Sequence, residues 1–263
     1  MTDQTPLDRA HAAMQADPED EAARLRFYER LADAELFVLL FEEPQGEQIM
    51  PQVFDVDEGR VIVVFDREER LAEFAKETVP YVALSGRLVV EMLAGQGIGL
   101  GVNLSVAPSS ILIPSPAVDW LAGTLQQRPT EIEARPEELH APAGLPEALL
   151  SALDTKLAAA AGLAKMAYLA GVTYAGGAKG HMLAFIDAAP GAEGALAQAA
   201  GEALTFSGIE AGAMDVAFFA ASDPISGRLA KVGLRFDLPQ PEAAAEMPGA
   251  RPGMDPDKPP KLH

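Results

Sequence analysis

The stretch that decides the fold runs from Val61 to Asn103 and reads VIVVFDREERLAEFAKETVPYVALSGRLVVEMLAGQGIGLGVN. Its first five residues, 61–65, are β-branched or aromatic, which is typical of a buried strand. Asp66 stands where a helix N-cap is expected, and Glu69 three residues later completes a capping-box pattern. We therefore predict a strand that is followed at once by a helix.

The remainder of this stretch repeats the alternation and ends in a run of glycines. Residues 79–84 indicate a second strand, Ser85 an N-cap, and residues 88–93 a short helix with one apolar face. In residues 95–103 glycine alternates with larger residues, which predicts a strand with one face open to close approach. This order of elements predicts an α+β or α/β fold in which helices pack on a mixed sheet.

The residues around this stretch complete a first domain, which we place at residues 17–125. Asp17-Pro18 reads as an N-cap followed by proline at the first helical position, which predicts an amphipathic helix. A strand at residues 35–41 and a hairpin that turns at Glu58-Gly59 then lead into the decisive stretch. Residues 1–16, before this domain, are predicted to be disordered.

A second domain with the same order of elements is expected at residues 146–237. Its first two strands bracket Ala175 to Gly180, a turn that lacks the ending of a phosphate-binding loop. Prolines interleave with glutamates in residues 126–145, which we interpret as a linker. The shared element order suggests an internal structural duplication, and the Pro-rich residues 238–263 are predicted to form a disordered tail.

Composition excludes several classes of function. The 263 residues are 49% hydrophobic, enough for two ordinary cores, and the absence of cysteine excludes disulfides, thiolate catalysis and Cys-based metal sites. A net charge of −19 without a basic cluster disfavours nucleic acid and membrane surfaces as partners. The N-terminus lacks the charge and apolar segment of a signal peptide, and no apolar run approaches the ~20 residues of a membrane span. We therefore expect a cytoplasmic protein.

Several motifs of the first domain resemble the N-terminal domain of the SseB family, which is named for an enhanced serine sensitivity phenotype. They lie between about residues 20 and 125 and are Val63-Val-Phe-Asp66 with Arg70, Phe74, Tyr81-Val-Ala-Leu-Ser-Gly86, Gly97-Ile-Gly-Leu-Gly-Val-Asn103, Ile113-Pro114 and Trp120-Leu121. Residues 149–236 are weakly similar to the C-terminal domain of that family. Where family members have a Pro-Gly pair and a Pro-Phe-Tyr ending, this chain has Leu104-Ser105 and Leu234-Arg-Phe236. The resemblance implies the fold, but the family has no established reaction, so it implies no catalytic residue.

Candidate sites are few, and each has a plain structural interpretation. The glycine run enters a strand rather than a helix, so it is not a dinucleotide-binding fingerprint. Gly97 and Gly99 either let the protein's own backbone pack closely or admit a peptide or small ligand. Trp120, next to Asp119, either recognises a partner or packs its helix against the sheet. No histidines have metal-ligand spacing, so we expect neither a metal nor a cofactor.

These features favour a noncatalytic protein that binds another protein or a peptide, with a role in amino-acid metabolism suggested by the family's phenotype. The alternative is a small-molecule sensor or an enzyme whose polar pocket combines Arg87, Asn103 and Asp119 with residues of the second domain. A deep pocket with at least two ionisable groups would favour the alternative, and a broad apolar patch would favour the binding protein. The sequence does not indicate an oligomeric state.

Overall fold

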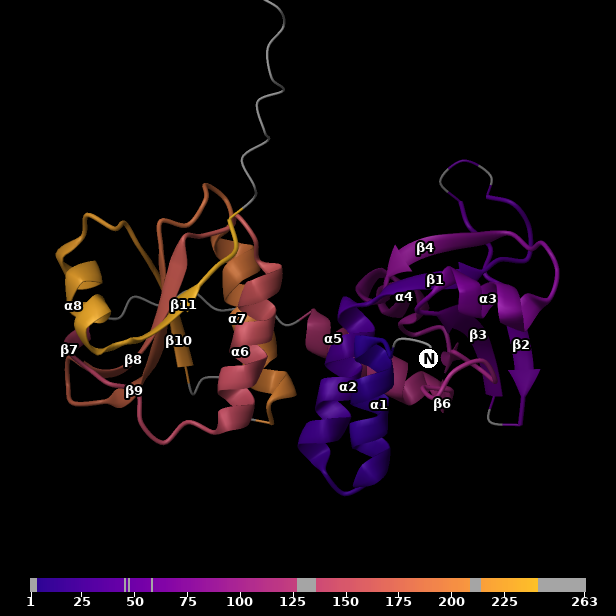
Figure 1. The fold of residues 1–263 in the computed structure, drawn as a ribbon, viewed down its shortest axis with the longest axis horizontal. Coiled ribbons are helices and arrows are strands. Elements are labelled where there is room, and N and C mark those ends of the chain that lie inside the picture. Colours follow the sequence, from indigo (N-terminus) through magenta and orange to yellow (C-terminus); the bar gives the residue numbers. More distant parts are fainter. Residues whose placement is uncertain are drawn as a thin grey trace, which may run out of the picture.

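The chain folds into two units, each built on a mixed sheet (Figure 1). The computed structural model describes residues 4–44, 46, 48–57, 59–126, 136–208 and 214–240. The first unit contains α1 (Pro6–Ala16), α2 (Glu21–Asp33), β1 (Glu35–Leu39), β2 (Val53–Val56), β3 (Gly59–Phe65), α3 (Glu68–Ala75), β4 (Tyr81–Ser85), α4 (Gly86–Leu93), β5 (Ile98–Val102), β6 (Ile111–Ile113) and α5 (Ser115–Leu125). The second contains β7 (Pro136–His140), α6 (Glu147–Ala159), β8 (Met166–Tyr174), β9 (Lys179–Ile186), α7 (Glu193–Phe206), β10 (Met214–Phe219), α8 (Pro224–Val232) and β11 (Leu234–Asp237). The predicted α+β class with two mixed-sheet domains is confirmed.

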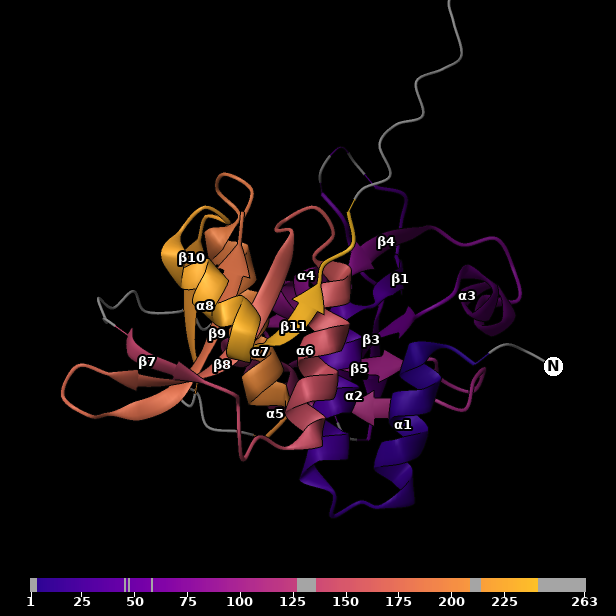
Figure 2. The ribbon, with the colours of Figure 1, turned by 60° about the vertical axis from the view of Figure 1, so that its left-hand side comes forward.

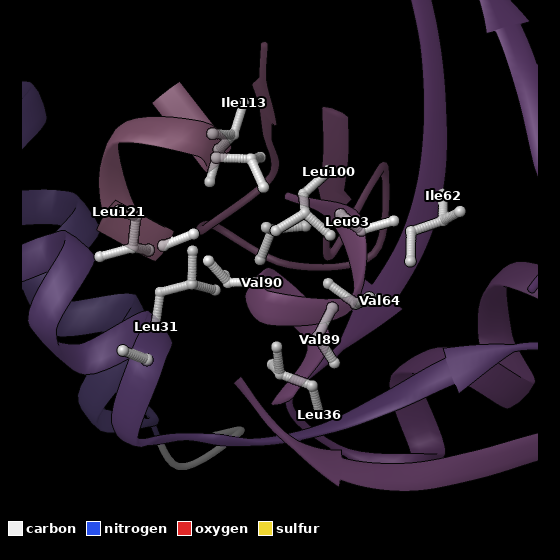
Figure 3. Packing of buried hydrophobic residues seen from close by; sticks show 14 of the residues in the cluster. Leu31, Leu36, Ile62, Val64, Val89, Val90, Leu93, Leu100, Ile113 and Leu121 are labelled. Carbon is white, nitrogen blue, oxygen red and sulfur yellow. The ribbon is translucent and has the colours of Figure 1, made fainter. Parts of the chain in front are cut away.

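The first sheet has the strand order β4-β1-β3-β5-β6, and β2 also pairs with β3. β3 and β5 are parallel neighbours, so their carboxyl ends lie at the same edge of the sheet. Side chains of α2, α4 and α5 pack on one face of this sheet, where Leu31, Val90 and Leu121 meet Val64 and Leu100 (Figure 3). α3 packs on the other face, so both faces of the central strand β3 are buried.

The second sheet has the order β10-β9-β8-β11, and β7 pairs with β8 beside β11. β7 and β11 therefore share one edge of β8. Leu169 of β8 pairs with Leu234 of β11, and Gly171 pairs with His140 of β7, so the two strands approach each other at Ala170. α6 and α7 cover one face of this sheet and α8 the other.

The two sheets share a central antiparallel pair of strands but differ in how the outer strands attach to it. In the first unit this pair is β1 and β3; β4 pairs with β1, the first of them, and β5 pairs with β3, the second. In the second unit the pair is β8 and β9; the corresponding β10 pairs with β9, the second strand, and β11 pairs with β8, the first. The element order suggested by the sequence is therefore shared, but the positions of the two outer strands are exchanged between the units.

Helices α6 and α7 lie between the second sheet and the helices of the first unit, as Figures 1 and 2 both show. Phe206, at the end of α7, is fully buried and belongs to the core of the first unit together with Phe27 and Leu31 of α2. The side chain of Gln198, also on α7, donates a hydrogen bond of 3.1 Å to the backbone carbonyl of Leu125. The two units therefore share part of one core.

At the N-terminus and after β3 the structure differs from the sequence-based expectations. Residues 6–16, expected to be disordered, form α1, in which Thr5 and Asp8 make a reciprocal capping box and Pro6 occupies the first turn. Asp66 does not cap α3: the N-cap is Arg67, and the Asp66 carboxylate instead binds Arg70. The predicted N-cap Ser85 is confirmed, because its side chain accepts a hydrogen bond from the backbone N–H of Leu88.

The predicted linker and tail also need correction where the structure describes them. Residues 136–140, placed in the linker, form β7 of the second sheet. Leu238, placed in the disordered tail, is buried, and its N–H donates to the carbonyl of Lys165 over 3.3 Å. The side chain of Gln240 donates to the carbonyl of Ala164 over 3.1 Å. The remaining tail, 241–263, and residues 127–135 of the linker lie outside the described part of the chain.

Candidate functional site

A buried polar cluster lies at the carboxyl ends of the parallel strands β3 and β5. Asp66 directly follows β3 and Asn103 directly follows β5, and the Asn103 side-chain oxygen accepts a hydrogen bond of 3.1 Å from the Asp66 N–H. Asn103 is fully buried and has a φ of +49°, a conformation that asparagine tolerates better than most residues. We call the whole set the Asp8 cluster: Thr5, Asp8, Asp66, Arg70, Asn103 and Ser109.

The Asp8 carboxylate is the centre of this cluster. The Arg70 guanidinium binds both of its oxygens, with distances of 3.0 Å from Nη1 and 2.5 Å from Nη2. The Ser109 hydroxyl donates to Oδ1 over 2.5 Å, and the Thr5 N–H donates to Oδ2 over 3.0 Å. Burial acts to raise the pKa of Asp8, but the hydrogen bonds from Arg70, Ser109 and Thr5 outweigh it and hold the pKa well below its usual range. Asp8 is therefore ionised in the folded protein.

The groups that bind Asp8 are themselves held by residues outside α1. Arg70 Nη1, at the start of α3, also contacts Oδ1 of Asp66, which precedes the helix, at 2.6 Å. Asn103 Nδ2 donates to the Ser109 oxygen over 2.8 Å. Both groups therefore keep a fixed partner that does not depend on the position of Asp8.

His11 lies one turn after Asp8 on the same face of α1. It is buried, its ring meets Phe27 edge-on with centroids 5.7 Å apart, and its Nε2 has no hydrogen-bond partner in the described residues. Burial lowers the pKa of His11, because the charged form loses more hydration than the neighbouring Asp8 charge compensates.

A second set of charged side chains lies between the two units, centred on Lys156 of α6. The Lys156 Nζ is 2.6 Å from an oxygen of Asp33, 3.2 Å from Glu202 and 3.6 Å from Glu29, and only 7% of the lysine side chain is exposed. Asp33 and Glu29 belong to α2 of the first unit, whereas Glu202 belongs to α7 of the second. We call this set the inter-unit charge cluster: Glu29, Asp33, Arg87, Lys156 and Glu202.

Arg87, one of the predicted site residues, supplies the second cation of this cluster. Its guanidinium makes two bonds to Glu202, of 2.7 Å and 2.5 Å, and one of 3.0 Å to Asp33. The hydrogen bonds that Arg87 donates to Glu202 raise the pKa of Arg87 further above its already high value. Arg87 therefore meets residues of the second unit, as the pocket hypothesis required, but it is paired with carboxylates there.

The two glutamates of the cluster differ in their electrostatic surroundings. Burial raises the pKa of Glu29 more than the charges of Lys156 and Arg30 lower it. Burial also acts to raise the pKa of Glu202, but the hydrogen bonds and charge of Arg87, together with Lys156, lower it below its usual value. The fold thus stabilises the charge of Glu202 and disfavours the charge of Glu29.

Of the two predicted contacts in the glycine strand, Gly99 lies against the protein's own backbone, whereas a Cβ on Gly97 would meet nothing within 4 Å. A Cβ placed on Gly99 would lie 2.4 Å from the carbonyl oxygen of Ile113 in β6. Gly97 has a φ of +65° at the turn before β5, where glycine is favoured. Both glycines line a small hollow of about 60 Å³ together with Arg60 and Ser115. The close-packing interpretation explains Gly99 without a ligand.

Asp119 and Trp120 lie on α5 and serve different contacts. An oxygen of Asp119 accepts a hydrogen bond of 2.8 Å from the Gly95 N–H and so fixes the turn before β5. The Trp120 ring packs edge-on against Tyr28 at 5.3 Å between centroids, and 43% of the residue remains exposed. Arg87, Asn103 and Asp119 therefore belong to three separate sets of hydrogen bonds rather than to one pocket.

A larger hollow, of about 410 Å³, opens on the second unit. It lies between the connection from β7 to α6 and the junction of α8 with β11, next to the point where β7 and β11 approach each other. Its wall is entirely nonionisable, and Leu234 on its rim is 41% exposed. The lining residues are Pro142, Ala143, Gly144, Leu145, Leu150, Val232, Gly233 and Leu234.

Sequence reasoning missed most residues of these sites. Thr5, Pro6 and Asp8 carry a capping-box signal that would have identified α1. Lys156 and Glu202 carry no such signal, because their partners in α2 and α4 are more than 100 residues away. Within the described residues, no group of three or more His, Asp or Glu side chains is arranged to hold a metal ion.

A comparison with models of known protein families finds a match, which lies in the first unit. Residues 7–120 match the family model described as SseB protein N-terminal domain, a match that begins inside α1 and ends at Trp120. Neither the curated proteins nor the solved structures contain a match to this chain. In the described part of the chain, none of the helices has the length and apolar character needed to cross a bilayer.

Proposed function

We propose that this chain, whose residues 7–120 are an SseB N-terminal domain, is a noncatalytic regulatory protein that binds another protein or a peptide through the hollow of its second unit. The family resemblance suggests a role connected with amino-acid metabolism, and we propose a cytoplasmic location for it. One observation carries the proposal: the hollow of about 410 Å³ is open, and its walls are apolar or backbone. An apolar wall of this kind suits recognition of a side chain from a partner rather than acid–base chemistry.

The size of the hollow suits one or two apolar side chains. Burial of a Leu, Ile or Phe side chain contributes roughly 1.5–3 kcal/mol, so two such anchors supply the core of a weak, reversible interface. Leu234 adds its own exposed surface to this interaction. The chain's net charge of −19 repels acidic partners at long range, so we expect the recognised segment to be apolar with neutral or basic flanks.

The edge strands beside the hollow offer a way to align an extended segment. Among the strands that the structure describes, β11 pairs only with β8, so the polar backbone of its other side faces away from the sheet. An extended peptide that adds to this edge would place alternate side chains toward the hollow. We therefore expect the partner to supply an extended segment rather than a helix.

The test is affinity capture from native lysate with the full chain, followed by a binding measurement with the purified partner. Leu234→Glu places a charge on the rim of the hollow and should weaken binding of that partner at least ~10-fold, since a lost apolar anchor costs roughly 1.4 kcal/mol or more. Val53→Glu is the matched control, because Val53 is 44% exposed on the first unit. Equal affinity of both variants and the parent chain for every captured protein would exclude the hollow as the binding site.

A further inference from the structure

The carboxyl ends of β3 and β5 form the kind of crevice in which open α/β sheets bind ligands. From β3 the chain passes through α3 to β4, on one side of β3, whereas from β5 it passes to β6, on the opposite side. Adjacent parallel strands whose connections leave in opposite directions have a space between their carboxyl ends. In this chain the Asp8 cluster fills that space.

The ligand position in this crevice is occupied by a carboxylate from the chain itself. Asp8 comes from α1, which precedes every strand of the sheet, and its two oxygens are bound by the Arg70 fork and the Ser109 hydroxyl. Two parallel N–H bonds from arginine to a carboxylate, with a hydroxyl on one oxygen, are the contacts expected for recognition of a free carboxylate.

These carboxylate-binding groups are preorganised without α1. Asp66 holds the Arg70 guanidinium at 2.6 Å, and Asn103 holds the Ser109 hydroxyl at 2.8 Å. Removal of Asp8 would therefore leave a buried arginine with one carboxylate partner and an open position for a second. A monocarboxylate restores the charge balance that Asp8 provides, whereas a dianion adds one further negative charge beside Asp66.

α1 itself is held by a small set of buried side chains. Leu7, Asp8 and His11 are its buried residues, and the buried His11 Nε2 lacks a hydrogen-bond partner in the described residues. A buried polar atom without a partner carries a desolvation cost, which reduces the stability of the docked helix. Asp8 adds its charged contacts to the apolar packing of Leu7 and to the hydrogen bond from Thr5 to Asp66, so a ligand that takes its place would weaken the attachment of the helix.

We propose that the crevice formed by Arg70, Ser109, Asn103 and Asp66 is a binding site for a small monocarboxylate, which competes with Asp8 so that the ligand and docked α1 exclude each other. This site is independent of the apolar hollow. Binding of a small carboxylate to it would expose α1 and the α2 surface beneath α1.

The first experiment measures carboxylate binding in the full chain with Asp8→Ala. Formate and acetate should raise the melting temperature of this variant in a saturable way, relative to chloride at equal ionic strength. The increase should disappear in Asp8→Ala/Arg70→Met and should be absent in Asp187→Ala, which removes the surface partner of Lys165. Asp8→Asn, which preserves the shape of the side chain, replaces Asp8→Ala if that variant does not fold. No saturable effect of acetate or formate on the folded variant would overturn the proposal.

The second experiment separates a binding site from an ion pair that only holds α1 in place. Amide hydrogen exchange in residues 6–16 of the unaltered chain is measured with acetate at about ten times the dissociation constant found for Asp8→Ala. Exchange there should become about tenfold faster, because ligand at this concentration increases the population of the released state by that factor. Exchange in α6 should stay unchanged. Unchanged exchange in residues 6–16 would show that Asp8 is structural only, and an equal response to inorganic phosphate would overturn the assignment to carboxylates.

Discussion

The Nζ of Lys156 in α6 lies 2.6 Å from Oδ2 of Asp33 in α2, so one buried cation joins the second unit to the first. Two further carboxylates, Glu29 and Glu202, lie within 3.6 Å and 3.2 Å of the same nitrogen. The contact therefore depends on the cation more than on any single acid.

Lys156→Met should destabilise the whole chain, because it removes the cation and keeps the nearly isosteric stem. Loss of one partner from a buried ion pair costs about 3–5 kcal/mol, since the remaining charges stay desolvated. Urea unfolding measures the change in free energy. Lys165→Met is the control: it breaks a surface pair with Asp187 at 2.7 Å and should leave the midpoint unchanged. Similar midpoints for both variants would contradict this account.

At neutral pH Glu202→Gln should lower the free energy of unfolding, whereas Glu29→Gln should leave it unchanged or raise it. The raised pKa of Glu29 means that its ionised form opposes folding, so any stabilisation from this group is present below its unfolded pKa and is lost as pH rises through the folded value. The lowered pKa of Glu202 means that its ionised form favours folding, a contribution present above the unfolded pKa and lost as pH falls through the folded value.

At pH 7 we therefore expect Glu29→Gln to be neutral or stabilising and Glu202→Gln to be destabilising. The effect of Glu202→Gln should shrink as the pH falls below the unfolded glutamate pKa of about 4.3, whereas the effect of Glu29→Gln should shrink as the pH falls through its raised folded pKa and be gone by about 4.3. Denaturant unfolding at a series of pH values checks both signs. Destabilisation by both substitutions to the same extent would show that Glu29 is needed as a charge.

Phe206→Ala should destabilise the first unit although Phe206 belongs to the second. Its fully buried ring completes the core around Phe27 and Leu31, and truncation of a buried phenylalanine costs about 3–5 kcal/mol. Trp120 is the single tryptophan and reports on α5 of the first unit. Its fluorescence transition in urea should move to lower concentration. A transition that stays in place while the circular dichroism changes would mean that the units unfold independently.

Gly99→Val should destabilise the first unit, because its Cβ would collide with a backbone atom that no rotamer change can move. The 2.4 Å approach to the Ile113 carbonyl predicts a cost at or above the upper end of the ~1–3 kcal/mol typical of overpacking. Gly123→Ala in α5 is the matched control: a Cβ there meets nothing within 4 Å, and helix propensity predicts a gain of up to about 1 kcal/mol. Thermal unfolding of both variants tests the pair, and a stable Gly99→Val protein would refute the close packing.

Strong local signals in the sequence were sufficient to predict much of the fold. The β-branched run before Asp66, the N-cap Ser85 and the alternating glycines correctly indicate β3, α4 and β5. These features depend on contacts within a few residues. The capping pattern of Asp66 with Glu69 gave a wrong prediction. The Asp66 carboxylate does not cap α3 and instead accepts hydrogen bonds from Arg70 and Thr5.

The candidate sites were much less predictable, because their partners are distant in the chain. Arg87 was identified as a candidate, but the carboxylate that binds it, Glu202, is 115 residues away. Isolated charges on helix surfaces carry no periodic signal for which of them becomes buried by another unit. β7 was missed for a related reason: Pro136 and its neighbouring glutamates read as a linker, and only pairing with β8 makes them a strand.

The place of Phe206 in the first core has a consequence for how such chains are recombined in evolution. The stretch that matches the SseB N-terminal domain ends at residue 120, yet an aromatic ring encoded 86 positions later fills its interior. A gene that encodes only the matched stretch therefore encodes a domain with a cavity in its core, of the size of a phenylalanine side chain. Such a domain would need a larger side chain next to the cavity or an aromatic side chain supplied by a bound protein. Substitutions beside Phe27 and Leu31 should therefore correlate with the presence or absence of the second unit.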